Sequence, residues 1–304
     1  MPAARRPAVP PVPGGLVDLH ASVLRWYATH ARELPWRDEQ CSAWGVFVSE
    51  VMLQQTPVAR VEPVWRVWMQ RWPTPADLAA EPAGEVVRAW GRLGYPRRAL
   101  RLHEAARAMV ERFDGEVPPT HVELLTLPGV GAYTAAAVAA FAHGERTTVV
   151  DTNVRRVFAR LVEGRAQAAL SLTRAESELA ATLVPEDPAE AARWSVAVME
   201  LGALVCTARA PRCEGCPVRD RCAWVAAGQP PYDGPVRRGQ AWHGTDRQVR
   251  GAILARLRDS PTPVTRRALA AAGPDELQVD RCLDGLVSDG LVESLARKRF
   301  RLPA

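Results

Sequence analysis

Apolar residues recur along most of the chain at the three- and four-residue intervals that place them on one face of an α-helix. The pattern is clearest at Val61, Val64, Trp65, Trp68 and Trp72, and at Ala99, Leu102, Ala106, Met109 and Phe113. The alternation typical of β-strands is nearly absent before residue 290. We therefore expect a mostly α-helical protein whose periodic tryptophans belong to the core and are not surfaces for base stacking.

Three helix starts can be placed from local sequence. Thr120 with Glu123, and Thr173 with Glu176, have the spacing of a capping box, in which each side chain bonds the other residue's backbone N–H. Asp187 before Pro188 places a cap residue ahead of a proline at the first helical position.

The two ends of the chain differ in composition from the middle. Residues 1–15 are rich in proline, alanine and glycine and lack the apolar core of a signal peptide, which predicts a disordered leader. Residues 229–245 have the composition of a linker. Residues 246–304 predict a small winged-helix-like module, with helices near 246–258, 264–271 and 276–289 followed by a short basic hairpin.

Composition narrows the choice of partner and compartment. The 304 residues carry a net charge of +5, which suits a polyanionic partner. Lys298 is the only lysine among 39 basic residues, so almost no amine is available for covalent catalysis. No apolar run approaches the roughly 20 residues of a membrane span. We expect a soluble cytoplasmic protein, associated with the nucleoid through DNA and without a membrane partner.

Four cysteines, Cys206, Cys213, Cys216 and Cys222, follow the spacing C-x6-C-x2-C-x5-C. Four thiolates in so short a loop suit an iron–sulfur cluster or a zinc ion. Disulfides are disfavoured because the chain lacks a secretory signal, and Cys41 and Cys282 stand apart. Zinc ribbons favour two C-x2-C pairs, whereas only one is present, so the spacing favours a [4Fe-4S] cluster.

Residues 44–57, WGVFVSEVMLQQTP, predict an apolar helix that ends near Pro57. Glu50 and Gln54, four residues apart, would share one face of it. Apolar neighbours would desolvate the Glu50 carboxyl, raise its pKa and keep a proton on it near neutral pH. The alternative is an exposed glutamate on an amphipathic helix.

Two further segments combine a turn with a helix start. In LPGVGAYTAAA, Gly129 and Gly131 precede a helix and could let a DNA phosphate approach backbone N–H groups, or could form a turn only. In VVDTNVRRVFARL, Asp151 stands where a helix N-cap is expected, which is a purely structural role.

Together these motifs resemble the MutY-type adenine glycosylases of the endonuclease III, or helix-hairpin-helix, superfamily over residues 16–228. The resemblance implies a two-lobed fold. Residues 16–35 and 147–228 would form the cluster lobe, and residues 36–146 the central lobe with the helix-hairpin-helix. The tail is too short for the lesion-reading domain that these enzymes commonly append, which suggests a short, actinobacterial-like form.

The resemblance assigns four catalytic positions. Glu50 would be the catalytic acid, and Asp151 would face the sugar and stabilise an oxocarbenium ion. Asn153 would help to hold the attacking water. Tyr133 stands where glycosylases that also cleave the backbone carry a Schiff-base lysine.

The resemblance also assigns contacts to bases. Trp36 and Arg37 match adenine-pocket residues, Gln55 would wedge into the duplex beside Gln54, and Tyr95 would flank the opposing base. Two positions depart from the family pattern: Pro96 follows Tyr95 where a second tyrosine is usual, and Val196 replaces a glutamine or glutamate that meets the base edge.

Two groups of basic residues would contact phosphates: Arg209, Arg212, Arg219 and Arg221 in the cysteine loop, and Arg297, Lys298, Arg299 and Arg301 in the tail.

We therefore expect a monomeric, monofunctional glycosylase that binds double-stranded DNA and removes adenine opposite 8-oxoguanine or guanine. Two alternatives stay open at this point. One is a glycosylase of the same fold that removes thymine or damaged pyrimidines, and the other is a noncatalytic iron–sulfur DNA-binding protein.

Overall fold

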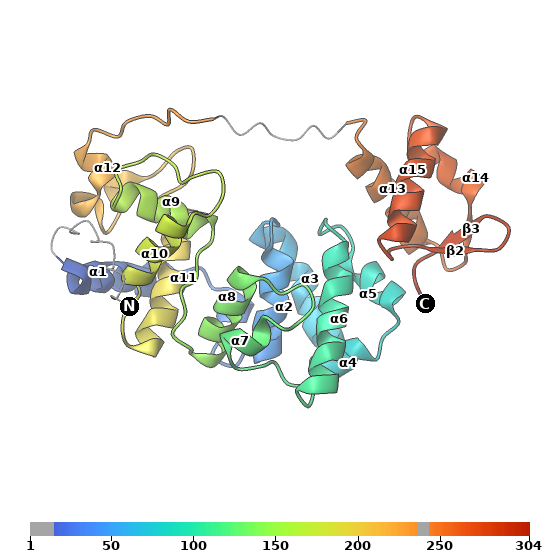
Figure 1. Ribbon diagram of the computed structural model, residues 1–304, viewed down its shortest axis with the longest axis horizontal. Helices are drawn as coiled ribbons and strands as arrows, with labels where there is room; N and C mark the ends of the chain where they lie inside the picture. Colours follow the sequence, from blue (N-terminus) through green and yellow to red (C-terminus); the bar gives the residue numbers. More distant parts are fainter. Residues whose placement is uncertain (1–14, 236–242) are drawn as a thin grey trace, which may run out of the picture. The chain divides into compact units, whose positions relative to one another are not determined.

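The computed structural model describes residues 15–235 and 243–304 and is mostly α-helical, which confirms the predicted fold class (Figure 1). The chain divides into two compact units. Unit 1 comprises Met1–Leu34, Pro119–Leu125 and Gly131–Pro235, and unit 2 comprises Pro35–Pro118, Thr126–Val130 and Val236–Ala304. Among the described residues, no helix is both long and apolar enough to span a membrane.

Unit 1 contains α1 (Gly15–His30), α7 (His121–Leu124), α8 (Ala132–His143), α9 (Thr152–Leu161), α10 (Arg174–Thr182), α11 (Pro188–Leu204), η2 (Cys213–Gly215), η3 (Arg219–Arg221) and α12 (Ala223–Ala226). Its main core joins α1, α9 and α11 through side chains such as Leu19, Phe158 and Trp194. Cys206, Cys216 and Cys222 pack against this same core. The cysteine loop is therefore anchored on the helices that follow Asp151.

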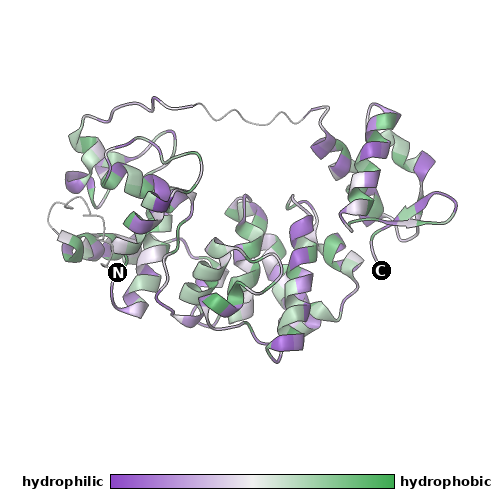
Figure 2. Ribbon diagram, viewed as in Figure 1, coloured by the Kyte–Doolittle hydropathy of each residue, from purple (hydrophilic) through white to green (hydrophobic). Residues whose placement is uncertain are grey.

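Unit 2 begins with η1 (Pro35–Arg37), α2 (Ala43–Leu53), α3 (Val58–Arg71), α4 (Pro75–Ala79), α5 (Ala83–Trp90) and α6 (Arg97–Arg112). Trp68 packs edge-on against both Trp72 and Trp90, and all three rings are buried. This confirms that the periodic tryptophans belong to the core. In Figure 2 the helices of both units carry green and purple bands, as amphipathic helices with one buried side should.

The local helix starts are confirmed. Thr120 and Thr173 each form a complete capping box with the glutamate three residues later. Asp187 accepts a hydrogen bond from the N–H of Glu190 at the start of α11, with Pro188 in the first helical turn. These signals were readable because a cap depends only on residues within four positions.

The tail of unit 2 contains α13 (Asp246–Asp259), β1 (Val264–Thr265), α14 (Arg266–Leu269), η4 (Ala270–Ala272), α15 (Glu276–Ser288), β2 (Glu293–Leu295) and β3 (Arg299–Arg301). The strands form an antiparallel sheet in the order β1-β3-β2. The helix predicted at 264–271 was wrong at its start. Thr265 is the N-cap of α14 and has an extended backbone. This backbone allows Thr265 to pair with Arg299 as the last residue of β1. The helices and the final hairpin follow one another in the predicted order, and β1 is a strand that the sequence did not predict.

The predicted leader and part of the predicted linker lie outside the described residues. Of residues 1–15, only Gly15 is described, and it begins α1 and is not part of a leader. Of the linker at 229–245, residues 236–242 lie outside the described residues.

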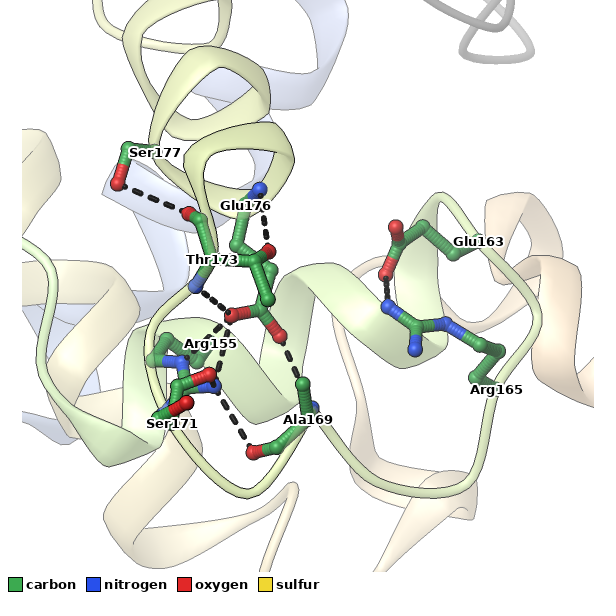
Figure 3. Close-up of polar contacts among 8 residues, drawn as sticks. All are labelled: Arg155, Glu163, Arg165, Ala169, Ser171, Thr173, Glu176 and Ser177. Atoms are coloured by element: carbon green, nitrogen blue, oxygen red, sulfur yellow. Dashed lines mark hydrogen bonds and ion pairs between the residues drawn. The ribbon is translucent and has the colours of Figure 1, made fainter.

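A buried ion pair joins α9 to α10 (Figure 3). The Arg155 guanidinium donates to Glu176 Oε2 from Nη2 at 2.7 Å and from Nε at 3.0 Å. Backbone N–H groups of Ala169 and Thr173 donate to the same carboxylate. Burial by itself raises the pKa of Glu176, but these N–H groups and Arg155 outweigh it and hold that pKa below its ordinary value.

We predict that Glu176→Gln lowers the free energy of unfolding at neutral pH by about 3 kcal/mol, because it leaves the Arg155 charge buried without its partner. A carboxyl with a depressed pKa stabilises the fold above its unfolded-state pKa, and this contribution is lost as pH falls through the folded-state value. The deficit should therefore shrink below the ordinary value of 4.5. Denaturant unfolding across this pH range measures it.

Glu178→Gln is the matched control, because Glu178 pairs with Arg174 at the surface of the same helix. It should change stability by less than about 0.5 kcal/mol. An equal loss in both variants would contradict a special role for the buried pair.

Candidate active site and cysteine loop

Glu50 lies in α2, and the helix around it is buried on every side. All residues from Trp44 to Met52 are buried, and Glu50 itself is 5% exposed. Ser42 starts the helix by accepting a hydrogen bond from the N–H of Gly45. Glu50 is therefore buried, as the sequence predicted, and the alternative of an exposed glutamate is excluded.

The two glutamines that follow are outside the helix. Gln54 is the C-cap of α2, where a ψ of 109° turns the chain out of the helix after this residue. Gln55 is exposed and has a φ of +55°, a left-handed conformation that costs a non-glycine residue about 1 kcal/mol or more. The strained turn presents the Gln55 side chain outward.

Arg98, a residue that sequence reasoning missed, holds this turn in place. Its guanidinium is almost fully buried and donates at 2.6 to 3.1 Å to five oxygens: the carbonyls of Val51, Met52, Gln54 and Gly94 and the hydroxyl of Thr56. Burial lowers its pKa to about 10. Three of these acceptors are carbonyls at the end of α2, which have no partners within a helix. No local signal marks this contact, because the partners lie more than 40 positions away in sequence, apart from Gly94.

Tyr95 follows directly on Gly94, in the turn that leads into α6. It has a φ of +47° and its ring is exposed at 42%. The Arg98 guanidinium lies 5.6 Å from the ring centroid. Arg98 thus links the turn that carries Gln55 to the turn that carries Tyr95.

The ELPWR segment forms the short helix η1. The Trp36 ring is 6% exposed and packs edge-on against Trp65 at 5.8 Å, so it belongs to the core of unit 2. Arg37 ends η1 and is half-buried.

The two glycines of the hairpin have different roles. Gly129 has a φ of +75°, and a Cβ there would lie 2.7 Å from Cβ of Arg101, so only glycine fits. Gly131 is the extended N-cap of α8 with open space around it. A small cavity in unit 2 is lined by Gly129, Gln54, Phe47 and Arg98, among others, so the structure brings the predicted Gln54 and Gly129 together.

Tyr133 is the second residue of α8 in unit 1. Its ring is half-buried and packs against the small alanine cluster of Ala136, Ala137 and Ala140. Tyr133 offers a phenol where a lysine would offer an amine.

Asp151 is the N-cap of α9, as its position predicted. Its Oδ1 accepts hydrogen bonds from the N–H of Asn153 at 2.8 Å and of Val154 at 2.7 Å, and its Oδ2 accepts one from Asn153 Nδ2 at 2.8 Å. Burial raises the pKa of Asp151, and these three donors oppose the rise. A capping role and a chemical role are compatible, because the cap orients a carboxylate that is largely desolvated.

A chain of hydrogen bonds leads from Asp151 to the cysteine loop. Asn153 Oδ1 accepts from Nη2 of Arg156 at 2.7 Å, and Arg156 Nε donates to the carbonyl of Cys206 at 2.7 Å. Gly202 permits this packing, because a Cβ there would lie 2.7 Å from Cβ of Asn153. Val196, on the same helix α11, is half-buried.

The cysteine loop has the donor set that an iron–sulfur cluster needs. Burial raises the pKa of Cys216 to about 12, and the thiols of Cys206, Cys222 and Cys213 add to this rise. Within the part of the chain that is described, no three ligand-type side chains are close enough for a single metal ion. Four cysteines on one loop, three of them packed against one core, provide the soft sulfur donors that a multi-iron group takes.

Basic side chains surround the loop. Arg209, Arg212 and Arg219 are exposed, whereas Arg221 is directed toward Asp18 at 3.6 Å. The Arg160 guanidinium donates to Cys206 Sγ at 3.4 Å and to the carbonyl of Thr207 at 2.8 Å. Three of the four predicted loop arginines are thus available to a ligand outside the protein.

Two family models match the chain. Residues 48–181 match the HhH-GPD superfamily base excision DNA repair protein, and residues 206–222 match the iron–sulfur binding domain of endonuclease III.

Curated relatives match nearly the whole chain. The adenine DNA glycosylase of Mycobacterium tuberculosis is 52% identical over 98% of both chains. That of Mycolicibacterium smegmatis is 55% identical over 92% of this chain and 94% of the relative. The human adenine DNA glycosylase is 46% identical over 66% of this chain and 38% of its own length.

Solved structures agree in fold. A thermostable thymine-DNA glycosylase matches 70% of this chain and 97% of its own, with a TM-score of 0.62 and 28% identity. Endonuclease III in a noncovalent DNA complex has a TM-score of 0.59 at 24% identity and covers 70% of this chain and 96% of its own.

We predict that replacing any one of Cys206, Cys213, Cys216 or Cys222 by serine removes or strongly depletes bound iron, which should otherwise reach about four atoms per chain. Iron analysis and the visible absorbance of the cluster measure this loss. Cys41→Ser and Cys282→Ser are the controls and should keep full iron, because both thiols lie outside the loop. Stoichiometric zinc without iron in protein prepared under exclusion of oxygen would contradict the cluster assignment.

Proposed function

Because the chain belongs to the adenine DNA glycosylases of the HhH-GPD superfamily, enzymes of base excision repair that carry an iron–sulfur cluster, we propose that its substrate is adenine opposite 8-oxoguanine or guanine in duplex DNA. The enzyme hydrolyses the N-glycosidic bond and leaves an abasic site. It acts as a monomer on a base turned out of the helix.

The burial of Glu50 is the observation that best supports the chemistry. Glu50 is 5% exposed in a helix of mostly apolar residues, and a carboxyl sheltered from water in this way suits proton transfer to a leaving purine. The role of a solvated surface glutamate does not fit this position. The proposed role of Glu50 is therefore that of general acid.

Asp151 and Asn153 suit the sugar side of the reaction. Burial raises the pKa of Asp151, three N–H donors directed at its oxygens oppose that rise, and in its ionised form the carboxylate would stabilise the positive charge that develops on the sugar. Asn153 is held on both sides, by Asp151 and by Arg156, and we assign it the positioning of the attacking water.

The DNA contacts follow from exposure and backbone shape. Gln55 and Tyr95, both exposed in strained turns, would meet the opposing base, with Gln54 beside them. Gly129 and Gly131 would receive a phosphate before α8. Trp36 and Arg37 would border the adenine pocket, although the buried Trp36 ring supports this pocket more than it touches the base.

In the tail, Arg297, Lys298 and Arg299 are exposed, while Arg301 pairs with Glu293.

The alternatives are separated by one experiment. Single-turnover base release should be measured on duplexes with adenine opposite 8-oxoguanine, adenine opposite guanine, thymine opposite guanine, and oxidised pyrimidines. Release of adenine from the first two alone supports the proposal. Release of thymine instead would favour the second enzymatic candidate, and binding without any release would favour a noncatalytic protein.

We predict that Glu50→Gln and Asp151→Asn each reduce adenine release by at least about a hundredfold while mismatch binding survives. The first substitution is isosteric but removes the acid proton, and the second keeps an N-cap acceptor but removes the charge. Single-turnover kinetics and a binding assay measure the two properties.

Glu104→Gln and Asp187→Asn are the matched controls, because Glu104 is exposed on α6 and Asp187 is the N-cap of α11. Both should retain wild-type rates. Normal release by Glu50→Gln or by Asp151→Asn would remove that residue from the mechanism.

We also predict that the enzyme releases free base without breaking the DNA backbone by β-elimination, because Tyr133 provides no amine for a Schiff base. Borohydride should trap no covalent complex with substrate DNA. A trapped complex that disappears in Lys298→Arg would show that the tail lysine supplies the amine after all.

A further inference from the structure

Helix α9 buries three arginines, and within residues 15–235 and 243–304 only one of them, Arg155, has a carboxylate bound to its guanidinium. Arg155, Arg156 and Arg160 are 8%, 9% and 3% exposed. A buried cation is costly unless a negative group or a full set of hydrogen bonds compensates for the lost water. The three side chains therefore allow a direct comparison of how each charge is balanced.

Arg155 is balanced within the protein. The Glu176 carboxylate takes two of its N–H groups, and the carbonyls of Ala169 and Ser171 take more (Figure 3). None of these three partners belongs to the cysteine loop.

Arg160 has hydrogen bonds but no acid. Its acceptors are the carbonyls of Ala166, Thr207 and Ala208 and the sulfur of Cys206. The Trp224 ring covers the guanidinium at 4.7 Å. Among the described residues, no carboxylate forms an ion pair with it. Carbonyl dipoles satisfy its N–H groups, yet they leave a whole positive charge in the interior.

Arg156 is an intermediate case. It donates to the carbonyls of Cys206 and Gly202 and to the amide oxygen of Asn153. Asn153 in turn donates to the Asp151 carboxylate, so Arg156 is connected to that carboxylate through one side chain. Arg156 is thus shared between Asp151 and the loop, whereas the acceptors of Arg160 are one sulfur and three carbonyls, two of these in the loop.

We propose that the bound iron–sulfur cluster is the counter-ion of Arg160, and that this charge helps to set both the retention of the cluster and its redox potential. Four thiolates outweigh the positive charge of an iron–sulfur core, so the liganded group is a net anion. Cys206 Sγ already lies 3.4 Å from Arg160 Nη1. The pairing balances a buried cation with the one anionic group that this loop binds.

The direction of the effect on the potential follows from charge. Reduction adds one negative charge to the cluster, so a neighbouring cation stabilises the reduced form more than the oxidised form. Hydrogen bonds to the ligand sulfurs act in the same direction. Removing the Arg160 charge should therefore lower the midpoint potential.

The experiment compares three full-length variants with wild-type protein, each loaded with its cluster. Arg160→Met removes the charge and keeps the chain length, and Arg160→Lys keeps the charge with fewer donors. The double variant Arg155→Met/Glu176→Gln removes the neutral ion pair that joins α9 to α10. Iron content and the midpoint potential in the absence of DNA are measured for each.

We expect Arg160→Met to shift the one-electron equilibrium by about tenfold toward the oxidised cluster, a fall of about 59 mV. Arg160→Lys should stay closer to wild type, and the double variant should keep the wild-type potential even though it loses stability. If Arg160→Met cannot be isolated with iron while Arg160→Lys and the double variant can, the charge is needed for retention and the proposal holds.

An unchanged potential in iron-loaded Arg160→Met would overturn the proposal. The proposal is also overturned if Arg160→Met and Arg160→Lys both lose iron, or if both change the midpoint potential by the same amount. The hydrogen-bond geometry of Arg160, and not its charge, would then determine the property. None of these readouts depends on adenine release, so they remain distinct from the test of the proposed activity.

Discussion

Helix α9 carries buried guanidinium groups whose charge must be balanced, and neighbouring segments of unit 1 supply the groups that bind them. Arg155 fixes α10 through Glu176, Arg156 connects Asn153 to the carbonyl of Cys206, and Arg160 holds the loop beyond it. Because an unsatisfied buried cation is far more costly than a satisfied one is beneficial, each arginine restricts its neighbours to one arrangement. The same helix begins at Asp151, so the loop and the candidate catalytic carboxylate share one support.

The two candidate catalytic carboxyls occupy environments of different kinds. Glu50 is buried inside a helix whose residues are almost all apolar. Asp151 is also desolvated, but three N–H donors converge on it. At Asp151 burial is the largest influence and raises the pKa, and the three N–H donors oppose this rise without cancelling it.

In unit 2 a single side chain organises the turns proposed to meet DNA. Arg98 donates hydrogen bonds to the carbonyls at the end of α2 and to the Gly94 carbonyl in the turn before α6. These bonds hold Gln55 and Tyr95 at positive φ angles that neither residue would keep alone. Such strain persists only where the surroundings over-determine it. The result is two exposed side chains on rigid turns, which suits recognition that must discriminate one base pair from another.

Much of this protein can be read from its sequence, because the relevant physics is local: helical periodicity, caps at Thr120, Thr173 and Asp187, four closely spaced thiols, and the motif around Glu50. Other features depend on residues distant in sequence and could be decided only by the fold. The end of α2 before Gln54, the burial of Trp36 on Trp65, and the partners of Arg98 and Arg160 all lie in this group. A guanidinium carries the same charge and donors wherever it occurs, and only packing determines which carbonyl, carboxylate or sulfur it meets.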